Sequence, residues 1–217
     1  MVKSLLLSLI LALTLSCSSC SISRSVRDLY IESGPAVFLL ETETGHCSSF
    51  HIGNGLILTA AHCVEDKGEE VVHLDPDTHI KHPKVLVDND EQDIAILLVP
   101  EAKELPFAVL GELPSIGERL TTIGFPGYWK SKTIDVGYVI GTGVLENTSV
   151  VFGSGNAFPG ESGGPVLDER GFVVGLVSRI SPRGIMYMDG RHLHRDVSVF
   201  IAVDQIQKEV TKLLTER

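Results

Sequence analysis

Three short strings of the sequence hold the residue types that acyl transfer by a serine needs. In chain order they are Thr59-Ala60-Ala61-His62-Cys63, Asp93-Ile94-Ala95-Ile96-Leu97 and Gly160-Glu161-Ser162-Gly163-Gly164-Pro165. A serine nucleophile needs a base that takes its proton and an acid that holds this base in the right tautomer. The three strings supply one histidine, one aspartate and one serine for these roles.

The glycines around Ser162 meet a further requirement of this chemistry. Glycine permits a tight turn whose amide groups are free to point at a ligand, so the N–H groups of Gly160 and Ser162 are the expected donors to an oxyanion. Each string alone also has an ordinary structural explanation, as a satisfied histidine, a turn aspartate or a glycine-rich turn. The serine string is the most specific, and the three in this order favour catalysis.

The loop before Asp93 contains other acids, namely Asp88, Asp90 and Glu91. Only Asp93 leads directly into an apolar run, which suits a carboxylate buried behind a histidine. The other acids are expected to be solvated loop charges. Asp93 is therefore the predicted orienting acid.

The strings resemble the chymotrypsin/trypsin clan of serine proteases, whose catalytic residues follow the order His, Asp, Ser along the chain. The resemblance implies that His62 is the general base, Asp93 the acid that orients it and Ser162 the nucleophile. It also places Ser178 beside the buried aspartate, next to the main-chain edge that pairs with substrate. The implied substrates are proteins or peptides, cleaved through an acyl-enzyme.

The separations along the chain are short, with 31 residues from His62 to Asp93 and 69 from Asp93 to Ser162. Together with the strings at 115–119 and 122–126, they resemble bacterial HtrA-type (high-temperature-requirement) proteases over roughly residues 35 to 216. The peptide-binding module that usually follows in that family is not expected here. Two antiparallel β-barrels, with the site in the cleft between them, are the fold that this resemblance implies.

The sequence departs from the clan at two places. Glu161 stands before the nucleophile, where the clan usually has Asp or Asn, and Arg179 and Ile180 occupy the pocket edge where many trypsins have Trp and Gly. The resemblance places Asn156 and Ala157 at the base of the primary pocket. Because a buried substrate cation would lack a partner there, small or medium uncharged side chains are the expected preference.

The first twenty residues have the pattern of a signal peptide. Lys3 precedes an apolar run from Leu5 to Leu15, which is too short to span a bilayer as a permanent helix. Thr14-Leu15-Ser16-Cys17 resembles a bacterial lipoprotein box, in which Cys17 would be lipidated and would anchor the protein to a membrane. Ordinary cleavage near residues 16–21 would instead leave a soluble secreted protein, and both alternatives stay open.

Beyond this leader only Cys47 and Cys63 remain, 16 residues apart. Export permits disulfides, and two lone cysteines in an exported chain are expected to pair, with two buried free thiols as the alternative. The resemblance favours the pair, because these cysteines match the disulfide that closes the loop leading to the catalytic histidine.

The elements that must position these residues are mostly short strands. Apolar or alternating runs broken by turn residues predict them at 36–40, 55–59, 71–74, 84–87, 94–99, 119–123, 133–144, 149–152, 165–167, 172–178 and 197–203. Many short strands at this spacing indicate antiparallel barrels or a sandwich. A helix follows 197–203, with Asp204 as its expected cap and one apolar face.

The resulting organisation has four parts. They are a leader at 1–20, a linker at 21–34, a first barrel lobe at 35–112, and a second barrel lobe with its C-terminal helix at 113–217. The fold class is all-β.

Net charge and the spacing of the histidines argue against nucleic-acid partners and bound metals. The formal net charge of -10 disfavours a nucleic-acid partner. Histidines at 73, 79, 82, 192 and 194 lack carboxylates or cysteines at ligand spacing, so no metal and no cofactor is expected. The oligomeric state and natural substrate do not follow from the sequence. A protease-like fold that has lost cleavage and serves as a binding or adhesion module is the rival hypothesis, and esterase-type hydrolysis by the same triad is another.

Overall fold

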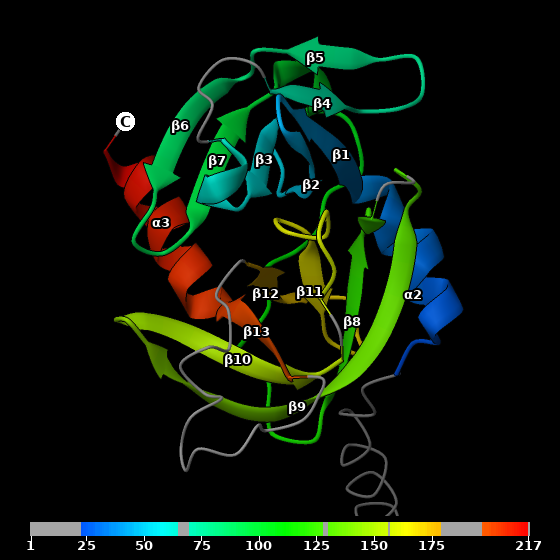
Figure 1. The fold of residues 1–217 in the computed structure, drawn as a ribbon, viewed down its shortest axis with the longest axis vertical. Coiled ribbons are helices and arrows are strands. Elements are labelled where there is room, and N and C mark those ends of the chain that lie inside the picture. Colours follow the sequence, from blue (N-terminus) through cyan, green and yellow to red (C-terminus); the bar gives the residue numbers. More distant parts are fainter. Residues whose placement is uncertain (1–22, 65–69, 128–129, 156, 179–196, 217) are drawn as a thin grey trace, which may run out of the picture.

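The computed structural model describes residues 23–64, 70–127, 130–155, 157–178 and 197–216. Figure 1 shows two β-rich lobes, one above the other, with helices along their sides. The first lobe contains β1 (Val37–Thr42), β2 (Gly45–His51), β3 (Leu56–Thr59), β4 (Val71–His73), β5 (His79–Lys81), β6 (Lys84–Asn89) and β7 (Ile94–Leu98). The second contains β8 (Arg119–Gly124), β9 (Thr133–Leu145), β10 (Thr148–Ser154), β11 (Pro165–Leu167), β12 (Val173–Val177) and β13 (Val197–Ala202).

All the strand pairs within the two sheets are antiparallel. The first lobe is one seven-stranded sheet in the order β5-β4-β1-β2-β3-β7-β6, whereas the second closes into a six-stranded barrel in the order β10-β13-β12-β11-β8-β9. The all-β, double-barrel prediction is confirmed, with the difference that the first lobe is a half-barrel. Only closure removes the unpaired edges of a sheet, so β5 and β6 remain as edges in the first lobe.

The two lobes share one apolar core, which fixes how they face each other. The largest cluster of buried side chains contains Phe50, Leu58 and Ile96 from the first lobe together with Ile123 and Leu176 from the second. Every residue of β3 is buried, as is nearly every residue of β7, so these strands read as continuous apolar runs. This packing brings the ends of β3 and β7 against the second lobe.

Several elements differ from the sequence-based expectations. Strands β2 and β5 were not predicted. Residues expected to be a linker include helix α2 (Val26–Ser33), where the Ser25 hydroxyl accepts from the Asp28 N–H at 3.1 Å and Leu29 is fully buried. The predicted helix cap was wrong, because α3 (Val203–Thr215) follows β13 directly and its N-cap is Ala202, which makes no side-chain hydrogen bond.

The chain passes between the lobes near residues 103–118. There the Ala108 N–H donates to His51 O in the first lobe and the Gly111 N–H donates to Val173 O in the second, both at 2.8 Å. Helix α3 also touches both lobes, since it packs on β12 and β13 and Asn89 donates to Glu209 at 3.0 Å. In the part of the chain that the structure describes, no helix is long and apolar enough to cross a membrane.

Candidate active site

The His62 and Asp93 strings meet at the face of the first lobe that is turned toward the second. His62 lies in the short helix η2 (Ala61–Cys63) after β3, and Asp93 immediately precedes β7, the neighbour of β3. Nδ1 of His62 lies 2.9 Å from both carboxylate oxygens of Asp93, and the His62 backbone N–H donates to Oδ1 at 3.0 Å. The carboxylate therefore fixes both the ring and the backbone of this histidine.

Asp93 is held in its charged form. Burial alone would raise the pKa of this carboxyl, but hydrogen bonds from His62 and from the Ser178 hydroxyl outweigh it, so the pKa lies below its usual range. The Ser178 hydroxyl donates to Oδ2 at 2.5 Å. Only 13% of each of the His62 and Asp93 side chains is exposed, so water competes little for these contacts. A charged Asp93 keeps the proton on Nδ1, which leaves Nε2 of His62 able to accept one.

Ser162 lies on a turn between β10 and β11 in which every carbonyl from residue 158 to residue 162 accepts a hydrogen bond. The donors are, in order, the N–H groups of Glu161 and Gly127, the Ser48 hydroxyl, and the N–H groups of Gly164 and Ser48, at 2.7–3.0 Å. Three of these five donors come from outside the turn. The backbone of the turn is therefore fixed from both lobes.

The amide groups of the same turn are used differently. Glu161 N–H donates within the turn, Gly163 N–H donates to Val177 O at 2.7 Å, and Phe158 N–H donates to the Glu161 carboxyl at 2.9 Å. Among the described residues, no acceptor lies at the N–H groups of Gly160 and Ser162. Because native backbone groups are almost always paired, two neighbouring donors without a protein partner point to a ligand that they would bind.

The turn depends on glycine at two positions. Gly160 has a φ of 95°, and a Cβ there would lie 2.3 Å from Phe125 O; Gly163 has a φ of 83°, and a Cβ there would lie 2.2 Å from Ser48 O. Both the left-handed backbone and the close approach of neighbouring main chain exclude side chains. The glycine-rich string is required for the shape of the turn.

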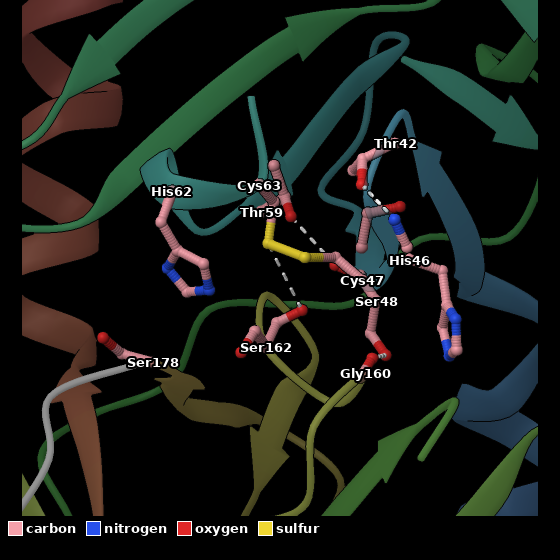
Figure 2. Close-up of a disulfide and its surroundings, with 12 residues drawn as sticks. Thr42, His46, Cys47, Ser48, Thr59, His62, Cys63, Gly160, Ser162 and Ser178 are labelled. Atoms are coloured by element: carbon pink, nitrogen blue, oxygen red, sulfur yellow. Dashed lines mark hydrogen bonds between the residues drawn. A yellow bond between two sulfur atoms is a disulfide. The ribbon is translucent and has the colours of Figure 1, made fainter. Parts of the chain in front are cut away.

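A cleft of about 690 Å³ lies at the boundary of the two lobes and is lined by Thr42, Thr44, Gly45, His46, Cys47, His62, Cys63, Gly127, Pro159, Gly160 and Ser162. Figure 2 shows His62 and Ser162 approaching each other from the two lobes, with Ser178 nearby. Among the described residues, no hydrogen bond joins the His62 ring to the Ser162 hydroxyl. In unliganded sites such bonds are often long and tighten only with substrate.

A disulfide joins Cys47 of β2 to Cys63 of η2, with the Cα atoms 6.1 Å apart. It ties the residue next to His62 to the strand that contacts the Ser162 turn. The sulfur atoms also lie near a ring nitrogen of His62, a grouping that would suit a metal. Because the two sulfurs are bonded to each other, they offer no thiolate to an ion.

Two residues that contact the second lobe beside the cleft, His46 and Ser48, were not predicted. A ring nitrogen of His46 lies 2.9 Å from Phe125 O, and the Ser48 hydroxyl donates to Gly160 O at 2.8 Å. Both flank Cys47, but no sequence motif marks either of them as a site residue, because their partners lie 79 and 112 residues away along the chain. Of the remaining specificity predictions, Ala157 is exposed and is not among the residues that line this cleft. Asn156 and Ile180 lie outside the described residues, as do Cys17, His192 and His194.

Comparison with known families and proteins gives similarities over most of this chain. A family described as "Trypsin-like peptidase domain" matches residues 47–176. Protease Do-like 2, chloroplastic, from Arabidopsis thaliana is 32% identical over 151 residues, which are 64% of this chain and 24% of that protein. A probable periplasmic serine endoprotease DegP-like from Pseudomonas putida is 32% identical over 164 residues, covering 72% of this chain and 33% of that protein. The chain thus matches a quarter to a third of the length of these relatives.

Solved structures show the same fold. The serine endoprotease from Yersinia pestis superposes with a TM-score of 0.73 at 19% identity, over 89% of this chain and 68% of that chain. HtrA-type protease AlgW with decapeptide gives a TM-score of 0.72 at 17% identity, over 88% and 68%. The resemblance to HtrA-type proteases is therefore confirmed at the level of family and fold.

Proposed function

Because the chain belongs to the trypsin-like peptidase family, we propose that it is a serine endopeptidase that uses His62, Asp93 and Ser162. The observation that carries the proposal is the pair of amides, at Gly160 and Ser162, that have no acceptor among the described residues, on the turn that holds the serine opposite an Asp93-oriented histidine. Base, acid, nucleophile and oxyanion donors are the four parts that acyl transfer by a serine needs.

The mechanism follows from the positions of these groups. His62 Nε2 takes the proton of Ser162 as the serine oxygen attacks the substrate carbonyl, and the resulting oxyanion accepts hydrogen bonds from the N–H groups of Gly160 and Ser162. His62 then gives the proton to the leaving amine, which breaks the peptide bond. Water, activated by the same histidine, hydrolyses the acyl-enzyme and restores Ser162.

The proposed substrates are proteins or peptides. The named relatives are proteases, and one structure with the same fold is described as holding a decapeptide. The cleft of about 690 Å³ is open enough to admit an extended chain. Small or medium uncharged side chains remain the proposed preference at the primary pocket, through Asn156, Ala157 and Ile180.

The proposed location is outside the cytoplasm, since the leader has a signal-peptide pattern and one relative is described as periplasmic. A disulfide beside the site suits an oxidising compartment. Whether Cys17 carries a lipid is decided by the mass of the mature N-terminus. An unprocessed N-terminus in cells would contradict export.

Labelling by a fluorophosphonate and cleavage of a peptide library test the proposed activity. We expect the wild-type protein to be labelled and to cleave, and Ser162→Ala to do neither, with a loss of turnover of at least about 10⁴-fold. Ser49→Ala is a matched control, because that serine is buried in the first lobe and donates to Phe38 O. Peptide cleavage retained by Ser162→Ala would exclude this mechanism, and an unreactive wild-type protein would favour a silent binding module. Hydrolysis of esters without peptides would indicate an esterase.

A further inference from the structure

The Ser48 side chain lies between the lobes, away from the reacting atoms. It is fully buried, it comes from β2 of the first lobe, and its hydroxyl donates to Gly160 O at 2.8 Å while accepting from the Phe125 N–H at 2.9 Å. Both partners belong to the second lobe. Figure 2 shows Ser48 reaching toward Gly160.

The Gly160 carbonyl belongs to the peptide bond that lies between the two proposed oxyanion donors. The N–H of the same peptide, on Glu161, donates to Phe158 O at 3.0 Å, so this peptide is held at both ends. Without the Ser48 hydroxyl, the carbonyl would be buried without a partner or would have to turn toward water in the cleft. Because Gly160 has the conformational freedom of glycine, such a turn has no side chain to oppose it.

A rotation of this peptide would be harmful to catalysis. It would bring a carbonyl oxygen toward the place where the two N–H groups bind the oxyanion. It would also turn the N–H groups of Gly160 and Ser162 so that they no longer point at the same place. Donors to an oxyanion act through being fixed in advance, so loosened donors stabilise the transition state less well.

Two glycines of the second lobe leave the space that the Ser48 side chain occupies. A Cβ on Gly124 would lie 2.8 Å from the Ser48 hydroxyl, and a Cβ on Gly164 would lie 3.3 Å from its Cβ. The backbone N–H of Ser48 also donates to Ser162 O at 2.8 Å. The two lobes therefore meet closely here, with the hydroxyl as the polar link between them.

We propose that Ser48 is a positioning residue, whose hydroxyl holds the Gly160–Glu161 peptide of the second lobe so that both oxyanion donors face the cleft. The inference rests on the proposed function and deepens it, since it makes the contact between the lobes a condition for oxyanion binding. Ser48 itself touches no substrate atom in this role.

The test compares Ser48→Ala with Ser49→Ala in the full chain. Both serines are fully buried neighbours in β2, but Ser49 donates within its own lobe, to Phe38 O at 3.3 Å. We expect Ser48→Ala to lower kcat by about 10- to 100-fold with KM changed less than about threefold, because the loss falls on the transition state. Ser49→Ala should keep kcat within about threefold of the wild type.

A second measurement separates this role from a structural one. A peptide aldehyde, which forms an oxyanion in the site, should bind Ser48→Ala more weakly by a factor similar to the loss in kcat, whereas a product peptide should bind equally well. All rates are measured at a temperature where circular dichroism shows each variant folded. Unchanged kcat and aldehyde affinity in Ser48→Ala would overturn the proposal, as would equal losses in both variants.

The failure of this inference can be distinguished from the failure of the proposed function. Failure of the wild-type protein to react with a fluorophosphonate refutes the activity itself. A reactive wild type with an unaffected Ser48→Ala refutes only the role of Ser48. A crystal structure of Ser48→Ala in which the Gly160 carbonyl keeps its direction, together with unchanged rates, would be a further refutation.

Discussion

Glu161 precedes the proposed nucleophile and is buried, with only 2% of the residue exposed. Burial raises the pKa of its carboxyl to about 7; the hydrogen bond from Phe158 N–H opposes this rise, and the negative charge of Asp135 adds to it. The acid that distinguishes this chain from the clan is thus protonated over much of the acidic range. Its proton is bound more tightly in the folded protein than in the unfolded chain.

The raised pKa of Glu161 makes the stability of the folded protein depend on pH. Between the ordinary pKa of 4.5 and the raised value of about 7, the folded state binds more protons, so the free energy of unfolding falls as pH rises through that window. Glu161→Gln keeps an acceptor for Phe158 N–H but does not ionise. We expect the free energy of unfolding of the variant to rise relative to that of the wild type as pH rises, by at most about 3 kcal/mol above pH 7.

Urea unfolding of both proteins at pH 5 and pH 8 measures the difference. A gap between variant and wild type that is the same at both pH values would contradict the raised pKa.

At the scale of single residues, the sequence identified the parts of the site that are recognisable by type. His62, Asp93 and Ser162 each occur in a string whose neighbours limit the alternatives, and the structure places the first two in contact. Ser48 and the burial of Glu161 could not be predicted, because they depend on contacts with residues far along the chain. The Ser48 hydroxyl, for example, meets a carbonyl 112 residues away.

At the scale of elements, the strands that were predicted are those with apolar or alternating side chains, such as β3, β7 and β9. Strand β2 was missed because its sequence, Gly45–His51, is largely polar. Ser48, Ser49 and His51 are nevertheless fully buried in it, each with a hydrogen bond from its side chain to a distant residue or loop. Polar strands of this kind are stabilised by tertiary contacts, which hydrophobic periodicity does not record.

The disulfide joins β2 to the short helix η2 that presents His62. Cross-linking residues 16 positions apart should stabilise the folded state by about 3 kcal/mol, mainly by restricting the unfolded chain. We expect the free energy of unfolding of Cys47→Ala/Cys63→Ala to be lower by this amount, so that the double variant unfolds at a lower urea concentration. Fluorophosphonate labelling should persist below the transition, because the Asp93 contacts still orient the histidine.

Urea unfolding of the double variant, with and without a reductant, checks this expectation. With the reductant, the wild type should unfold at a urea concentration close to that of the double variant. The unfolding of the double variant should not change with the reductant. A reductant effect of equal size in both proteins would show that the disulfide is not its cause.

At the scale of the whole molecule, the shared core predicts that the lobes unfold together. Ile206 of α3 is fully buried in the cluster that contains residues of both lobes. Ile206→Ala should cost about 2–4 kcal/mol because it leaves a cavity in this common core. The loss should appear as one transition at lower temperature, with no separate transition for either lobe.

Calorimetry of Ile206→Ala tests this cooperativity, with Leu214→Ala as its control. Leu214 lies on the same helix and is 59% exposed, so its truncation should change stability by less than about 0.5 kcal/mol. Two resolved transitions in the variant would show that the lobes are independent folding units.

The division of the site between the lobes determines when activity can arise during synthesis and folding. His62 and Asp93 belong to the first half of the chain, whereas Ser162, its amide donors and the strands that carry them come from the second half. On the proposed mechanism, a nascent or half-translocated polypeptide cannot cleave itself or other proteins, because it lacks the nucleophile and the oxyanion donors. Peptide-bond cleavage is therefore expected only in the last step of maturation, when both halves of the chain have folded on their shared core.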